Sequence, residues 1–190
     1  MKRVAAKFVP CLLSEDQRAD RLDVCREMKD QLKNDTDFLS KVITGDESWC
    51  YGYDPETRQW KSESSPRPKK ARQVKSNVKD MLICFFDIKG LVHFEFEPQG
   101  QTVKQMFYLE VLMRLHDAVQ RKCPELWRSG QWLLYQDNAP AHTALNVRQF
   151  LTKNGMTTAS YPPYSPDLAP CDFFLFPRMK RDLKESVSRI

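Results

Sequence analysis

The amino-acid sequence predicts a single α/β domain that follows a helical preamble. Its 190 residues, 41% of them hydrophobic, are enough to bury one core of ordinary size. Residue patterns indicate the order strand, strand hairpin, helix, strand, helix, strand, helix, with no internal sequence repeat. This alternation is typical of helices packed on a sheet. We therefore assign residues 1–41 to the preamble and residues 42–190 to the domain.

The preamble contains two predicted helices. Ser14 and Gln17 form a capping-box signature, and apolar residues follow at helical spacing, so the first helix is predicted over residues 14–33. The apolar residues at that spacing are Leu22, Cys25, Met28 and Leu32. A second, short helix is predicted over residues 37–41.

Three strand-like stretches come next. Residues 42–53 mix β-branched and aromatic side chains with glycines, which predicts a strand with a bulge or a close backbone approach near Gly45. Residues 81–87 and 91–96 flank a Lys-Gly turn, and the second of these stretches alternates apolar and polar side chains. Together they predict a β-hairpin.

The second half of the chain alternates helices with short strands. A core-facing helix is predicted over residues 103–122, because apolar side chains recur there at steps of three and four and Pro124 lies just beyond. Pro177 is expected to divide the last helical region, since proline in a helix interior costs about 3 kcal/mol. The remaining predicted elements are a strand at 132–136, a helix at 143–154 closed by Gly155, a strand at 157–161, and helical segments at 171–176 and 177–185.

Charge and cysteine content limit the function classes. A net charge of +5 and a pI near 8.9 permit a polyanionic partner without requiring one. The six cysteines are scattered and form no zinc-site pattern with the histidines, so we expect reduced thiols. The sequence has no signal-peptide pattern and no apolar run of roughly 18 residues, so we expect an intracellular protein without a membrane partner.

Residues 54–79 form a polar stretch rich in Ser, Pro, Lys and Arg. At this length and composition they predict an extended basic loop rather than packed structure. The ordinary interpretation of such a segment is a solvated loop.

Three aspartates stand out by their place along the chain. Asp46 follows strand-like residues, Asp137 ends a buried strand, and Asp172 opens the last helical region after a proline-rich turn. Neighbouring strands lie about 5 Å apart, so strand ends and a covering helix can bring three carboxylates together. Taken singly, Asp137 suits a turn, Asp172 suits a helix N-cap, and His142 suits a structural hydrogen bond.

Three longer stretches carry a resemblance to a known family. "VITGDESW", "QDNAPAHT" and "PPYSPDLAPCDFFLFP" resemble the catalytic domain of mariner-type transposases of the Tc1/mariner superfamily. The signature of that family is three aspartates with 34 residues between the last two, and residues 138–171 separate Asp137 from Asp172 here. "RVAAKFVPCLL", at residues 3–13, is similar to the family's linker motif, so residues 1–41 are interpreted as linker and helical preamble.

The resemblance implies an RNase H-like fold, a mixed β-sheet with helices on both faces. It also places Asp46, Asp137 and Asp172 at the catalytic and metal-binding positions, with the "YSPDLAP" turn presenting Asp172. Two Mg²⁺ or Mn²⁺ ions, about 3.5–4 Å apart, are the implied cofactors, and such hard ions prefer oxygen ligands. Glu47 competes with Asp46, because adjacent strand residues point to opposite faces and one of them enters the site. Asn138 and His142 are interpreted as supporting groups, DNA contacts or turn stabilisers.

The implied activity is metal-dependent DNA cleavage and strand transfer in cut-and-paste transposition. The implied partners are transposon-end DNA, a TA target and a second subunit bound to the same DNA. By its place in the family, the basic loop reaches that second subunit and contacts phosphates, and a weak nuclear-localisation pattern at residues 68–72 agrees with a nuclear protein. The predicted DNA-binding residues are Arg67, Lys69, Lys70, Arg72 and Lys75.

Departures from the family pattern leave alternatives open. The family's N-terminal helix-turn-helix units are absent from these residues, and the domain is expected to be incomplete at its C-terminus. A catalytically inert, domesticated or decayed remnant that binds DNA or dimerises is therefore the alternative function. A piece of a fusion, such as a SET methyltransferase joined to a mariner transposase, is a third possibility, but these residues contain no methyltransferase motif.

Overall fold

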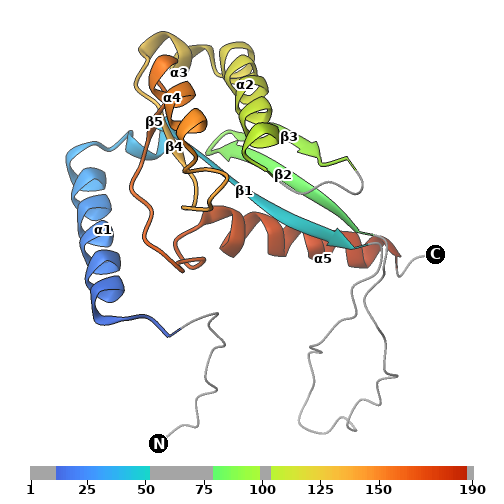
Figure 1. The fold of residues 1–190 in the computed structure, drawn as a ribbon, viewed down its shortest axis with the longest axis horizontal. Helices are drawn as coiled ribbons and strands as arrows, with labels where there is room; N and C mark the ends of the chain where they lie inside the picture. The colour runs from blue at the N-terminus through green and yellow to red at the C-terminus, as the bar shows by residue number, and fades with distance from the viewer. Residues whose placement is uncertain (1–11, 52–78, 99–103, 188–190) are drawn as a thin grey trace, which may run out of the picture.

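The computed structural model describes residues 12–51, 79–98 and 104–187. These residues form a five-stranded sheet in the order β3-β2-β1-β4-β5, with α2 and α4 on one face and α5 on the other (Figure 1). The predicted basic loop falls largely outside the described residues, and so do Arg67, Lys69, Lys70, Arg72 and Lys75.

The sheet is mixed, as expected. The strand β1 pairs with β2 antiparallel and with β4 parallel, β2 pairs with β3 antiparallel, and β4 pairs with β5 parallel. The long β1 therefore lies at the centre, where its two edges hold strands of opposite direction. The strands are β1 (Val42–Tyr51), β2 (Lys79–Asp87), β3 (Gly90–Phe96), β4 (Leu133–Tyr135) and β5 (Thr157–Thr158).

Of the two alternatives predicted near Gly45, a bulge or a close backbone approach, the close approach is confirmed. A Cβ atom at Gly45 would lie 2.2 Å from Cδ1 of Phe85, so the backbone approaches that ring more closely than any side chain allows. The β1–β2 register runs without a shift from Thr44 to Tyr51. The irregularity of the sheet lies instead between β2 and β3, next to Phe85 and Phe86.

The helices follow the predicted order, with one addition. The helix α3 was not predicted, because Pro124 was interpreted only as the end of α2; proline also suits the first turn of a helix, where it stands here. The strands predicted at 132–136 and 157–161 and the helix at 143–154 are shorter than expected, whereas the two hairpin strands each begin earlier than expected, at Lys79 and Gly90. The helices are α1 (Glu15–Asn34), the 3-10 turn η1 (Phe38–Lys41), α2 (Gln105–Lys122), α3 (Pro124–Ser129), α4 (Leu145–Lys153), the π-helical turn η2 (Cys171–Leu175) and α5 (Phe176–Val187).

The last helical region changes its geometry where the sequence predicts a division. The turn η2 ends at Leu175 and α5 begins at Phe176, so Pro177 occupies the first turn of α5. The two run on without a break, since Phe176 keeps helical dihedral angles and donates its N–H to the Cys171 carbonyl. Pro177 has no N–H to donate, and the wider π-helical turn lies directly before it.

The main core lies between the sheet and the helices α2 and α4. Strand side chains such as Ile43 and Phe85 are fully buried there against Leu112 of α2 and Val147 of α4. Burying a large apolar side chain contributes about 1.5–3 kcal/mol, so this layer supplies most of the hydrophobic stabilisation. A smaller cluster covers the opposite face under η2 and α5, and its buried members are Leu82, Cys84, Cys171 and Phe176.

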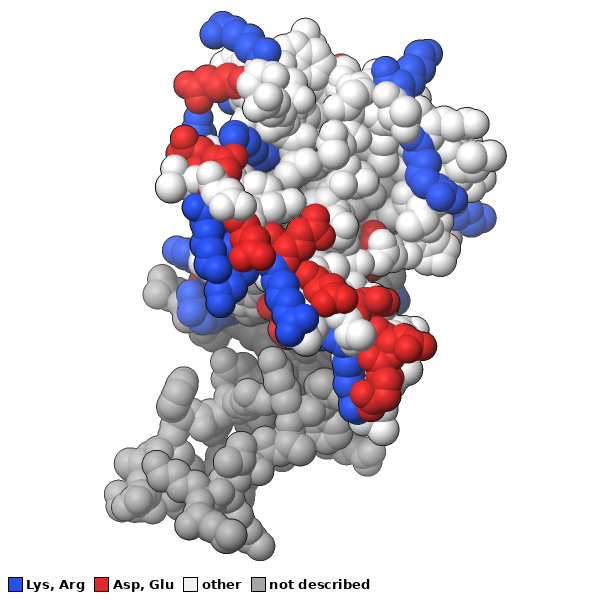
Figure 2. Space-filling model, turned by 90° about the vertical axis from the view of Figure 1, so that its left-hand side faces the viewer, with Lys and Arg blue, Asp and Glu red and all other residues white. Residues whose placement is uncertain are grey.

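The helix α1 stands apart from both clusters. It has no buried residue, although the predicted capping box between Ser14 and Gln17 is present. Its exposed surface carries interleaved acidic and basic side chains (Figure 2), several of them paired three residues apart. This face of the molecule is therefore of mixed charge rather than uniformly basic.

The described cysteines agree with the prediction of reduced thiols. The five described cysteines are all free, and Cys11 lies outside the described residues. Among the described helices, none has the length and hydropathy needed to cross a bilayer.

Candidate active site

Asp46, within β1, and Asp137, just beyond the end of the parallel strand β4, lie at the same level of the sheet. Thr44 of β1 pairs with Tyr135 of β4, and each aspartate lies two residues further along its chain. Because side chains alternate along a strand, Asp46 shares the face of Thr44. Asp46 also stands opposite Cys84, which belongs to the cluster under α5. Asp46 therefore faces η2 and α5, not the main core.

The π-helical turn η2 brings Asp172 to the same face. Cys171 is fully buried over β2, where its thiol and that of Cys84 interact, which raises the pKa of Cys171 together with its burial. This anchoring sets the next residue, Asp172, close enough to Asp46 that each carboxyl group affects the pKa of the other. The N-cap interpretation of Asp172 is wrong, since Pro170 occupies that position.

The pKa of Asp46 reflects the proximity of the three carboxylates. Burial first, and then the negative charges of Glu47, Asp172 and Asp137, raise the pKa of Asp46 to about 7, against the lowering effect of one hydrogen bond from the Glu47 backbone N–H. The pKa of Asp172 is also raised, first by burial and then by Asp137. Two of the three carboxylates are therefore hard to ionise together without a neighbouring positive charge.

Asp137 is held differently. Its Oδ1 accepts the backbone N–H of Ala139 at 2.9 Å and lies 2.7 Å from Nδ1 of His142. Burial opposes ionisation, but these two donors outweigh it, and the pKa of Asp137 is lowered. The turn interpretation of Asp137 is thus confirmed, because one oxygen closes the turn, and its catalytic role stays a prediction.

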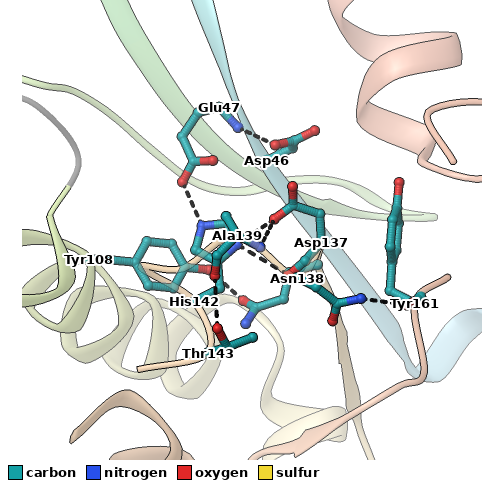
Figure 3. A network of polar contacts seen from close by, with 10 residues as sticks. Asp46, Glu47, Tyr108, Asp137, Asn138, Ala139, His142, Thr143 and Tyr161 are labelled. Atoms are coloured by element: carbon teal, nitrogen blue, oxygen red, sulfur yellow. Dashed lines mark hydrogen bonds and ion pairs between the residues drawn. The ribbon is translucent and has the colours of Figure 1, made fainter. Parts of the chain in front are cut away.

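His142 links the end of β4 to β1 (Figure 3). It is buried, and its Nε2 lies 3.0 Å from Oε1 of Glu47 while its Nδ1 faces Asp137. Burial lowers its pKa, but the two carboxylates outweigh burial and raise the pKa to about 10. His142 is therefore a cation at neutral pH, and Glu47 belongs to its side of the sheet rather than to the side of Asp46.

The proline-rich turn before Asp172 is tied to several elements. The side-chain amide of Asn138 donates to the Tyr161 carbonyl at 2.7 Å, and the Tyr161 hydroxyl donates to the Ser165 carbonyl at 2.9 Å. From α1, Arg21 donates to Ser165 Oγ at 2.6 Å and pairs with both carboxylate oxygens of Asp167. Asn138 thus serves as a brace between the two segments that carry Asp137 and Asp172.

Lys180 is a candidate functional residue that the sequence interpretation missed. Its Nζ donates to Oγ of Ser48 at 2.7 Å, and its charge lowers the pKa of Asp172. Ser48 lies two residues after Asp46 on β1 and therefore on the same face. A signal was present in the sequence, because Lys180 follows Asp172 by about two helical turns.

The donor chemistry of the site fits a hard divalent cation, although the ligands are not gathered into a closed set. Asp46, Asp137 and Asp172 offer carboxylate oxygens only, which Mg²⁺ and Mn²⁺ prefer over nitrogen or sulfur. In the described part of the chain, no group of three or more His, Cys, Asp or Glu side chains already has metal-binding geometry. The residues fit in kind, and a cation would relieve the repulsion that Asp46 experiences.

Comparison with known proteins identifies relatives of this chain. The family described as "Transposase (partial DDE domain)" matches residues 50–129. Mariner Mos1 transposase of Drosophila mauritiana is 33% identical over 181 residues, which cover 94% of this chain and 52% of that protein. The chain thus spans about half the length of this curated relative. The crystal structure of the catalytic domain of Mos1 mariner transposase matches at 31% identity and a TM-score of 0.74, covering 96% of this chain and 82% of that one.

The chain belongs to the mariner transposase family. The RNase H-like fold and the catalytic-domain assignment predicted from the sequence are confirmed. Mos1 paired end complexes solved with Mn and with Mg match this mariner domain at TM-scores of 0.84 and 0.83 and at 31% and 32% identity. Each match covers 100% of this chain and 57% of the Mos1 chain.

Proposed function

We propose that this mariner transposase domain catalyses DNA cleavage and strand transfer in cut-and-paste transposition, assisted by two Mg²⁺ or Mn²⁺ ions. Asp46, Asp137 and Asp172 are the proposed catalytic and metal-binding residues. The observation that carries the proposal is the convergence of these carboxylates from β1, from the end of β4 and from η2, which is expressed in the raised pKa of Asp46.

Each side chain has a distinct part in this chemistry. Two cations held by these residues would supply an activated attacking oxygen and a stabilised leaving oxygen for an in-line phosphodiester displacement. Asp46, whose pKa both other aspartates raise, would serve both cations. Asp137 and Asp172 each complete one site, and Lys180 holds a positive charge beside Asp172.

The partners follow from the family. Mos1 has been solved in paired end complexes, and we propose that this chain likewise acts on transposon-end DNA as a dimer, with TA dinucleotides as targets, in the nucleus. Phosphate contacts are assigned to the basic loop, whose charges suit a DNA backbone. Its proposed contact residues are Arg67, Lys69, Lys70, Arg72 and Lys75.

A plasmid-nicking assay tests the enzymatic part. The purified chain is incubated with supercoiled plasmid and Mg²⁺ or Mn²⁺, because nicking requires no recognition of a transposon end. We expect metal-dependent nicking that Asp137→Ala and Asp172→Ala abolish. Asp117→Ala is the matched control, since its side chain is 74% exposed on α2, and it should nick like the wild type.

The alternative function predicts a different result. A catalytically inert remnant would show no nicking and no rise in melting temperature with either metal. That outcome would overturn the enzymatic proposal and leave DNA binding or dimerisation as the role of the folded domain.

A further inference from the structure

We infer that Glu47 and His142 form a positioning pair that orients the carboxylate of Asp137, so that Oδ1 is used inside the protein and Oδ2 is directed to the metal site. This inference rests on the function proposed above. It removes Glu47 from the candidate metal ligands and gives it a separate task on the other face of the sheet.

Both nitrogens of the His142 ring are engaged. Nδ1 lies 2.7 Å from Oδ1 of Asp137, and Nε2 lies 3.0 Å from Oε1 of Glu47. The His142 side chain is 2% exposed, so water does not compete for either contact. The ring therefore has one allowed orientation, fixed from both ends.

Packing holds the same orientation from the core. The ring of Tyr108, which is fully buried on α2, lies against the His142 ring with centroids 4.0 Å apart. The Tyr108 hydroxyl donates to the side-chain oxygen of Gln136, the residue before Asp137. The pair is thus supported by the rigid main core rather than by a surface loop.

The two oxygens of Asp137 are used unequally. Oδ1 receives both the Ala139 N–H and the His142 ring, whereas Oδ2 has no hydrogen-bond partner among the described residues. A carboxylate held by one oxygen keeps the other free for a ligand in a defined direction. Groups that orient metal ligands in this way commonly change metal affinity by about 10–100-fold when they are removed.

Alternation along β1 explains why Glu47 can do this beside Asp46. Neighbouring strand residues point to opposite faces, so Asp46 faces η2 while Glu47 faces α2. The backbone N–H of Glu47 also donates to Oδ1 of Asp46 at 2.8 Å. The adjacent residues Asp46 and Glu47 therefore have separate parts. Asp46 is a proposed metal ligand, and Glu47, through His142, orients the proposed ligand Asp137.

Manganese binding provides a test that does not depend on catalysis. Free Mn²⁺ is titrated against the purified chain by electron paramagnetic resonance, and the melting temperature without metal is recorded for each variant. We expect Glu47→Ala and His142→Leu to raise the Kd for Mn²⁺ by about tenfold or more. Glu47→Gln keeps an oxygen acceptor for the ring N–H and should restore binding to within about threefold of the wild type.

The chain contains a matched control. His93 and Glu95 on β3 form a second His–Glu contact, also at 3.0 Å, that touches none of the three aspartates. Glu95→Ala should leave Mn²⁺ binding unchanged whatever it does to the melting temperature. His142→Leu removes a buried polar group and can prevent folding. In that case Glu47→Ala, at a less buried side chain, is the variant that tests the inference.

The outcomes separate this inference from the function beneath it. If the wild type binds Mn²⁺ and folded Glu47→Ala binds it equally well, the positioning pair is wrong and the proposed function stands. If Glu47→Ala only lowers the melting temperature, the contact is structural and the inference is again wrong. A wild type that binds no Mn²⁺ would overturn both.

Discussion

The two faces of the sheet bury different amounts of apolar surface. Toward α2 and α4, side chains such as Ile43 and Leu112 are completely buried. Toward α5 the cluster is small, and Phe94 and Phe96 on β3 remain 51% and 53% exposed. The carboxylates of Asp46 and Asp172 lie on this second face. The comparison indicates that one face supplies the rigid packing while the other is left accessible for chemistry.

The largest expected effect is on the packed face. Leu112→Ala should lower the free energy of unfolding by about 2–5 kcal/mol, because it leaves a cavity among fully buried neighbours. Urea denaturation measures the loss. Met113→Ala, at the next residue of α2 but 45% exposed, is the control and should cost much less. Equal losses at the two residues would contradict the assignment of α2 to the core.

A second substitution tests how tightly β1 fits this face. Gly45→Ala should destabilise the protein by about 1–3 kcal/mol, since the new methyl group must displace the Phe85 ring. Thermal unfolding followed by circular dichroism gives the change. Adding Phe85→Leu to Gly45→Ala should recover part of the lost stability. A double variant whose loss of stability equals the sum of the two single losses would refute the contact.

On the open face, removing a charge should stabilise the protein. The pKa of Asp46 is raised from its ordinary value of 3.8 to about 7 in the folded protein. Protonated Asp46 therefore stabilises the fold in full at pH values below the unfolded pKa, and this stabilisation is lost as pH rises through about 7. Without divalent metal, Asp46→Asn should therefore gain about 1–2 kcal/mol at pH 8 and little at pH 4. Urea titrations at both pH values in EDTA measure this. A destabilised variant at pH 8 would show that Asp46 is not under repulsion.

The smallest effect is expected at the exposed aromatic side chains. Phe94→Ser should change the free energy of unfolding by no more than about 0.5 kcal/mol, because half of the ring is already in water. Val92→Ala, on the same strand but 2% exposed, is the comparison and should cost more. A large loss at Phe94 would mean that the open face is packed more tightly than the difference in burial indicates.

Sequence patterns predicted the elements well where local physics decides them. The hairpin of β2 and β3, the capping box of α1 and the apolar periodicity of α2 are all present. The prediction failed where one residue type has two local roles, as Pro124 does at the start of α3. The three aspartates remain predicted catalytic residues, and the structure adds that two of them share a face of the sheet.

The sequence by itself determined the family, the order of elements and the candidate aspartates, because these depend on residue type and spacing along the chain. Tertiary structure decided which side of β1 each acid uses, which oxygen of Asp137 is engaged, and that His142 and Lys180 reach the site. The contacts of His142 with Glu47 and of Lys180 with Ser48 join residues that are 95 and 132 positions apart. No local pattern encodes such pairs, since they form only when strand alternation, helix packing and burial act together.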